Sequence, residues 1–260
     1  MRNDFNTFSF RASDGNTVKL EYRSSLPSTS DLAKEYAKAG YPDRYAIFTE
    51  KQTAISALGT PLANGESEKG IFISCILRPS IFASQAGCIR PLSALALSLA
   101  LEEHTSKNIG IGWIGDIYCE GVKIGKTNVE GKTKDSQYEF LIINFAVRLD
   151  EKSFPPRLTD MVRQVFEESN FSVPMIMAKT ILNKFFSIYK DLKSPTKHIN
   201  LYASKFALNN VRIKFIENGK KKTVKCVGIN KEDISLIAET RDGRSISINS
   251  PSSIITPNRI

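Results

Sequence analysis

The chain has 260 residues, of which 41% are hydrophobic and 24% are charged, proportions typical of a globular protein that buries a core. No apolar run approaches the roughly 20 residues that span a bilayer, and no apolar run follows the charged N-terminus, so we expect a cytoplasmic protein without signal peptide or membrane anchor. Four cysteines without a C-x-x-C pair, and two histidines, argue against a zinc site. The net charge of +9 is compatible with nucleic acid, a membrane surface or an acidic protein partner.

The first half of the chain mixes predicted strands and helices. In chain order these are strands over 7–12 and 17–23, a helix over 32–38, strands over 45–49 and 71–77, and a helix over 91–103. The first two strands are separated by a turn signal, so residues 6–23 are expected to form a hairpin. Residues 50–69 are polar and show no clear period, which is typical of a functional or mobile loop.

The second half changes character along the chain. Its predicted elements are strands over 109–113 and 138–147, helices over 157–168 and 174–192, and short strands over 211–216, 223–227, 234–238 and 245–248. We therefore expect an α/β (α+β) core over residues 1–193 and a small C-terminal β domain over residues 205–260. The lysines at 220–222 follow the turn signal Asn218-Gly219; they are interpreted either as a solvated hairpin or as a contact surface for an acidic partner.

An acid and an amine are brought together by residues 111–126. A strand delivers Trp113 and Asp116, and a tight turn over 119–122 returns Lys123 close to them. One interpretation is a cross-strand ion pair. The other is a lysine that holds the carboxylate and phosphate of an activated acid, beside an aspartate that binds magnesium. The spacing alone leaves both interpretations open.

At this point the sequence resembles the catalytic domain of biotin protein ligases, in the larger biotin/lipoate ligase family. Those enzymes carry Trp-Pro-Asn-Asp, a turn, and then Lys-x-x-Gly, where this chain has Trp113-Ile-Gly-Asp and Lys123-Ile-Gly-Lys. Their Ser-Thr-Asn is matched by Ser28-Thr29-Ser30, their strand-ending glutamine by Gln52, and the asparagine of their Gly-x-Gly-x-Asn strand by Asn144. The order and spacing of these motifs span about residues 24–250.

The resemblance implies a biotin/lipoate ligase-like mixed sheet with helices, a C-terminal SH3-like β-barrel and a two-step reaction. Biotin, as substrate, and ATP would give biotinyl-adenylate, which a lysine of a carrier protein then attacks. By this match Lys123 and Asp116 are the catalytic residues, and Asp116 and Asn144 lie near magnesium (Mg) or the nucleotide. The residues that the match assigns to the substrate pocket are Ser28, Thr29, Ser30, Gln52, Trp113, Gly125 and Asn144.

The partners implied are biotin or a similar small carboxylic acid, an acidic carrier domain and, because family members often pair through the central sheet, a second copy of the chain. DNA binding is not expected, because residues 1–25 are predicted as strands and are too short for the helix-turn-helix that some family members carry.

Several departures from the family pattern favour a function other than ligation. The family's Gly-Arg-Gly-Arg-x-Gly loop is replaced by residues 54–59, which lack arginine. The positive charges that would neutralise the phosphates during adenylation are therefore missing from this loop. Phe140 and Ile142 occupy glycine positions, where their bulk would block a ligand, and Arg78 and Arg90 are interpreted as bounding the neighbouring strand and helix. The alternatives are a non-catalytic binding protein on the same fold, and an unrelated structural protein whose Asp116–Lys123 pair is only an ion pair.

Overall fold

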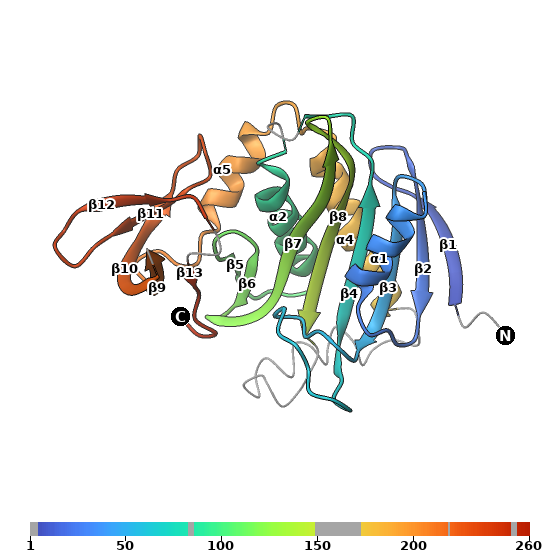
Figure 1. The fold of residues 1–260 in the computed structure, drawn as a ribbon, viewed down its shortest axis with the longest axis horizontal. Helices are drawn as coiled ribbons and strands as arrows, with labels where there is room; N and C mark the ends of the chain where they lie inside the picture. Colours follow the sequence, from blue (N-terminus) through green and yellow to red (C-terminus); the bar gives the residue numbers. More distant parts are fainter. Residues whose placement is uncertain (1–4, 83–85, 149–172, 218, 251–253) are drawn as a thin grey trace.

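The computed structural model describes residues 5–82, 86–148, 173–217, 219–250 and 254–260 (Figure 1). A central eight-stranded sheet has the order β1-β2-β3-β4-β8-β7-β6-β5. Its strands are β1 (Phe5–Arg11), β2 (Thr17–Arg23), β3 (Tyr45–Gln52), β4 (Glu68–Leu77), β5 (Ile109–Ile111), β6 (Asp116–Cys119), β7 (Val122–Lys134) and β8 (Gln137–Arg148). Only the β2–β3 pair is parallel, so within the described residues the sheet is mixed.

Helices cover both faces of this sheet. One face carries α1 (Thr29–Lys38), which packs on β3, β4 and β8, and the other carries α2 (Ile89–Glu102) and α4 (Val173–Tyr189), which pack on each other (Figure 1). The body of α2 is apolar almost all round, because it lies between the sheet and its neighbours α4 and α5 (Thr196–Ser204).

A second, antiparallel sheet of five strands follows α5. It has the order β12-β11-β10-β9-β13, with β9 (Arg212–Glu217), β10 (Lys220–Ile229), β11 (Leu236–Glu239), β12 (Ser245–Ile248) and β13 (Ile254–Ile255). Its buried side chains form one cluster with Trp113 and Tyr118 of the first sheet region. The Trp113 indole Nε1 donates to the Ile234 carbonyl at 2.7 Å, and the Tyr118 hydroxyl donates to the Pro257 carbonyl at 2.6 Å. The two sheets therefore share a core.

The mixed α+β fold expected from the sequence is the fold observed. The hairpin over residues 6–23 is present as β1 and β2, whereas the SH3-like barrel and the domain limits stay predictions. The sequence analysis missed α5, which follows the expected boundary at Ser194-Pro195, and most of β7, whose distal residues are polar and exposed. The helix predicted over 157–168 and the turn at Asn218 lie outside the described residues. Among the described helices, none is long and apolar enough to cross a membrane.

The Trp113 anchor gives a first prediction. Replacing Trp113 by Ala should lower the free energy of unfolding by about 3–5 kcal/mol, because it empties a shared core and leaves the Ile234 carbonyl without its donor. Urea denaturation measures the loss. Val227→Ala, at a half-exposed position of the same second sheet, is the control and should change stability little. Equal losses in both variants would contradict the anchoring role.

Candidate functional site

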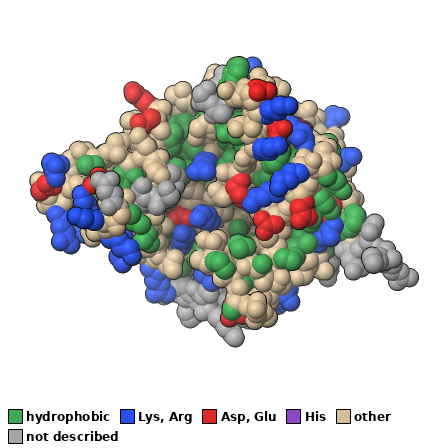
Figure 2. Space-filling model, viewed as in Figure 1, with side chains coloured by type: hydrophobic (Ala, Val, Ile, Leu, Met, Phe, Trp, Pro, Cys, Tyr) green, Lys and Arg blue, Asp and Glu red, His purple; other side chains and the backbone are tan. Residues whose placement is uncertain are grey.

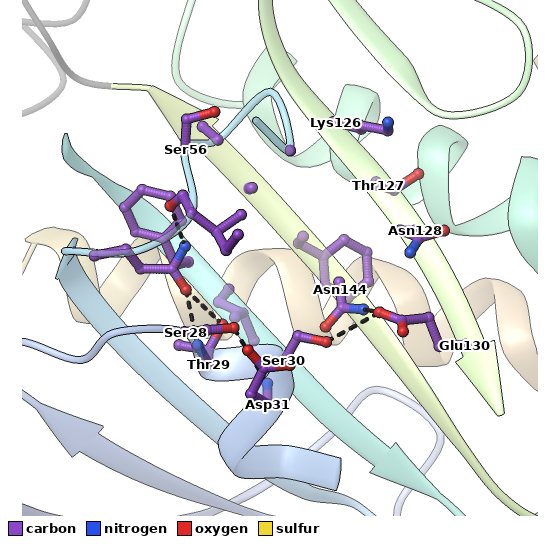
Figure 3. Close-up of a pocket in the computed structure, with 18 of the residues that line it drawn as sticks. Ser28, Thr29, Ser30, Asp31, Ser56, Lys126, Thr127, Asn128, Glu130 and Asn144 are labelled. Atoms are coloured by element: carbon purple, nitrogen blue, oxygen red, sulfur yellow. Dashed lines mark hydrogen bonds between the residues drawn. The ribbon is translucent and has the colours of Figure 1, made fainter. Parts of the chain in front are cut away.

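The larger cavity, of about 290 Å³, opens where the N-terminus of α1 meets the sheet (Figure 3). Its volume is at the lower end of the range for small-molecule sites, which is roughly 300–1,000 Å³. Polar side chains from α1, β3, β7 and β8 line one part, and Phe72, Ile73 and Phe145 give it apolar walls. The loop that follows β3 contributes Ile55 and Gly59. The cavity thus combines apolar surface with a few convergent polar groups.

The start of α1 is fixed by a cap and by Gln52. Ser28 is the N-cap residue, and its hydroxyl accepts a hydrogen bond from the Asp31 amide at 3.2 Å. The Gln52 Oε1 atom accepts from the Thr29 amide at 2.7 Å, and its Nε2 donates to the Ile55 carbonyl at 2.8 Å. A single buried amide therefore ties the beginning of the helix to the loop that covers the cavity.

A chain of hydrogen bonds continues from Thr29 across the floor of the cavity. The Ser74 hydroxyl lies 2.9 Å from the Thr29 hydroxyl and 2.7 Å from Asn144 Oδ1. The Asn144 amide then donates to Glu130, which also accepts from Ser30 at 3.0 Å (Figure 3). Because each polar group holds the next, the polar side of the cavity is rigidly arranged.

Lys34 neutralises Glu130 at the rim of this network, with Nζ 2.7 Å from Oε2. Burial by itself would lower the pKa of Lys34, but the hydrogen bond and charge of Glu130 outweigh it, so the pKa is raised. Lys34 is therefore a permanent cation that is committed to Glu130.

A smaller cavity of about 160 Å³ adjoins the first, and the two share Lys126, Thr127 and Asn128 in their walls. It contains the Asp116–Lys123 pair, whose Oδ1 and Nζ atoms lie 2.8 Å apart, with both residues buried. The Thr256 hydroxyl donates to Asp116 Oδ2 and accepts from Lys123 at 3.3 Å. The ion pair inferred from the spacing is thus formed, and the C-terminal segment covers it.

Arg90 also lines the smaller cavity, where its Nη2 donates to the Val129 carbonyl at 3.2 Å. The expectation that Arg90 only bounds its helix is therefore incomplete. Arg78, by contrast, donates to backbone carbonyls of Tyr41, Ala37 and Glu139 and is structural, as expected.

The structure places the predicted site residues in two groups. The larger cavity is lined by Ser28, Thr29, Ser30, Gln52 and Asn144, and the smaller one by Trp113, Asp116 and Lys123. Gly125 lines neither cavity. A Cβ atom at this glycine would lie 2.5 Å from the Ala146 carbonyl oxygen, so the glycine permits close approach of β7 and β8.

Phe140 and Ile142 do not block the site. Both are buried under α1, in a cluster with Ala33 and Ile47, and neither lines a cavity. The expectation that their bulk would exclude a ligand is wrong, because along β8 these side chains lie under the body of the helix and Asn144 lies near its beginning.

Sequence reasoning missed Ser74, Glu130, Lys34 and Arg90. Ser74 gave a signal, since it is a lone polar residue in the apolar run over 71–77. The others gave no such signal, because charged side chains that are exposed or half-exposed are common in any sequence. Only the sheet register brings Asn128 opposite Asn144, with Glu130 two residues further along β7.

The two predicted magnesium ligands do not fit a single ion. Asp116 and Asn144 lie on β6 and β8, with β7 between them, and they line different cavities. Both Asp116 oxygens are engaged by Lys123 and Thr256, and Asn144 Oδ1 accepts from Ser74. Among the described residues, no group of three or more His, Cys, Asp or Glu side chains could hold a metal ion. We assign no reaction step to a metal held by this pair.

Comparison with known proteins supports the family resemblance. No protein-family model matches the chain. The bifunctional ligase/repressor BirA of Bacillus subtilis (strain 168) is 26% identical over 231 residues, which cover 86% of this chain and 70% of BirA. The BirA of Bacillus spizizenii matches to the same extent.

Solved structures give the same result for the fold. The biotin protein ligase from Aquifex aeolicus in complex with biotin and ATP has a TM-score of 0.66 at 19% identity, and the match covers 92% of this chain and 99% of that one. The Leishmania major biotin protein ligase in complex with biotinyl-5-AMP has a TM-score of 0.54 at 18% identity, and covers 89% and 98%. The chain therefore has the biotin protein ligase fold. The BirA matches add a likeness in sequence to a biotin ligase over most of the chain.

The buried pair gives a second prediction. Lys123→Met should lower the free energy of unfolding by about 3–5 kcal/mol, because it leaves the Asp116 carboxylate buried without its partner. The double variant Lys123→Met/Asp116→Leu should recover much of this loss, since no buried charge remains. Urea denaturation of the three proteins gives the coupling free energy.

Lys107→Met is the control for this cycle, because it removes one partner of the more exposed pair Lys107–Glu120 and should cost less than about 1 kcal/mol. Additive losses in the double variant would show that the Asp116 and Lys123 charges are not coupled.

Proposed function

We propose that the chain binds biotin, or a carboxylic acid of similar size, in the larger cavity, activates it with ATP and transfers it to a lysine of a carrier protein. The observation that carries this proposal is the network of Gln52, Thr29 and Asn144, because these three residues, each matched by a family motif, line one cavity and are joined through Ser74. The relatives that were solved with biotin and ATP, or with biotinyl-5-AMP, support the choice of ligands.

The two ends of the site suit different parts of the reactants. In the larger cavity the apolar walls bury the body of the acid, and the polar side chains around Thr29 and Gln52 orient its head group. In the smaller cavity the formal charges are three cations, Arg90, Lys123 and Lys126, against the single carboxylate of Asp116, a net charge of two positive. A positive, partly enclosed site favours the phosphates of ATP.

The proposed chemistry is an adenylation followed by an acyl transfer. A carboxylate oxygen of the acid attacks the α-phosphorus of ATP, and pyrophosphate leaves. The neutral amine of the carrier lysine then attacks the acyl carbon, an amide forms, AMP leaves and the amine loses a proton. The cations of the smaller cavity stabilise the negative charge that develops on the phosphate oxygens.

The carrier surface is part of the same proposal. Lys220, Lys221 and Lys222 are exposed at the start of β10, and Figure 2 shows Lys and Arg side chains gathered over the second sheet, on the left of this view. Such a surface favours an acidic carrier domain.

A second candidate function is binding without adenylation. It is favoured by the loop over 54–59, which carries no arginine into the cavity, and by the Asp116 carboxylate, which neutralises Lys123 while Thr256 accepts a further hydrogen bond from it. In this case the acid would be bound in the larger cavity and no pyrophosphate would be released.

The third prediction separates these functions. The purified protein, mixed with ATP, magnesium and biotin, should release pyrophosphate in a biotin-dependent manner, and calorimetry should detect biotin binding. Arg90→Met should lower the rate about 10²–10³-fold while biotin still binds, because it removes a phosphate-binding cation. Arg11→Met, at an exposed position on the edge strand β1, is the matched control and should leave the rate unchanged.

Three outcomes are informative here. Release that depends on Arg90 supports the ligase proposal. Biotin binding without release favours the binding protein. Neither binding nor release would remove biotin as the ligand.

A further inference from the structure

Lys126 occupies an unusual place between the two cavities. It lies on β7, opposite Asp116 on one side and Ala146 on the other, and it lines both cavities. In Figure 3 it lies at the end of the larger cavity away from Ser28 and Thr29. A ligand whose head group meets the polar network would therefore direct its far end toward this lysine.

The other lysines that line the two cavities are already paired with carboxylates. Lys34 pairs with Glu130, Lys123 pairs with Asp116, and Arg90 donates to a backbone carbonyl. Within the described part of the chain, Lys126 is the cation lining these cavities whose ammonium group makes no hydrogen bond or ion pair. A partly buried ammonium group without an anion can still bind one, because its three N–H donors remain available to a ligand.

The loop after β3 is folded so that it leaves room for this ammonium group. The Ser56 amide donates to the Thr60 carbonyl at 2.9 Å and the Gly59 amide to the Ser56 carbonyl at 2.9 Å, which closes a compact turn. Gly59 has φ of +79°, and a Cβ atom added there would lie 3.7 Å from Lys126 Nζ. The turn that replaces an arginine-bearing loop thus borders a single lysine supplied by β7.

An anionic ligand gains more from Lys126 than from Lys123. A carboxylate that approached Lys123 would meet the Asp116 carboxylate 2.8 Å from the same ammonium, and like charges would repel in a poorly solvated site. The two carboxylates that line the larger cavity, Asp31 and Glu130, both pair with Lys34. Lys126 therefore lies where the cavities join without a carboxylate partner among the described residues.

We propose that Lys126, rather than Lys123, binds the carboxylate of the acid, and that the chain therefore selects small monocarboxylates whose anionic end reaches the junction of the two cavities. The inference rests on the proposed function, since it needs an acid in the larger cavity. The carboxylate on Lys126 lies at the shared wall, where it can reach a phosphate in the smaller cavity. Lys123 then serves to hold Asp116 and Thr256 in place.

The test compares biotin with biotinamide, which has the same body without the negative charge. Calorimetry with Lys126→Met should show biotin affinity reduced about ten- to hundredfold, the loss expected for one charge-assisted hydrogen bond. The affinity for biotinamide should be unchanged. Lys69→Met, at an exposed position of β4 that lines neither cavity, is the matched control and should bind both ligands as the unmodified protein does.

Two results would overturn the proposal. Unchanged biotin affinity in Lys126→Met would do so, and so would an equal loss for biotin and biotinamide, which would indicate a change of shape instead of a lost charge.

Failure of the proposed function is distinguished with inorganic pyrophosphate. If the unmodified protein binds neither biotin nor biotinamide, the biotin assignment falls, and pyrophosphate is titrated into the same proteins. Loss of pyrophosphate binding in Lys126→Met alone would keep Lys126 as an anion-binding residue for a different acid. Pyrophosphate binding that does not depend on Lys126, or no binding at all, would overturn the Lys126 proposal as well.

Discussion

Asp116 and Lys123 are buried together at the place where the first sheet meets the C-terminal segment. A buried charge without a partner costs several kcal/mol, so each residue requires the other, and Thr256 satisfies the remaining carboxylate oxygen. The pair therefore fixes three elements at once: β6, the beginning of β7 and the segment around Thr256. The position of the second sheet, and the shape of the smaller cavity, follow from this local requirement.

The same pair defines the contribution that Lys123 can make to chemistry. The charge of Lys123 is offset by the Asp116 carboxylate, whereas Lys126 on the same strand has no carboxylate partner among the described residues. Two lysines three residues apart on β7 thus have different surroundings, because Lys123 is paired with a carboxylate and Lys126 is not. Arginine is missing from the loop after β3, but Arg90 reaches the smaller cavity from α2.

The site residues that could be predicted from the sequence are those that lie close together along the chain or belong to short motifs. The Asp116–Lys123 pair follows from one tight turn, and Ser28, Thr29 and Gln52 were found because their motifs are local. The remaining features join distant segments: Ser74 links Thr29 to Asn144, and Lys34 pairs with Glu130. The spacing of polar and apolar residues along the chain does not indicate these contacts, because they depend on the register of the strands in the sheet. For the same reason Phe140 and Ile142 were misjudged, because the position of α1 over β8 could not be derived from residue spacing.

The protein carries two positive regions that differ in how they meet solvent. The lysines at the start of β10 project into water, where salt at physiological strength screens charges beyond about 8 Å. In the smaller cavity Lys123 is buried between protein walls, where screening is weaker. Raising the ionic strength therefore weakens attraction at the outer surface first, while an anion held inside remains bound. Under the proposed function, salt concentration alone would separate recognition of the carrier protein from retention of the acid.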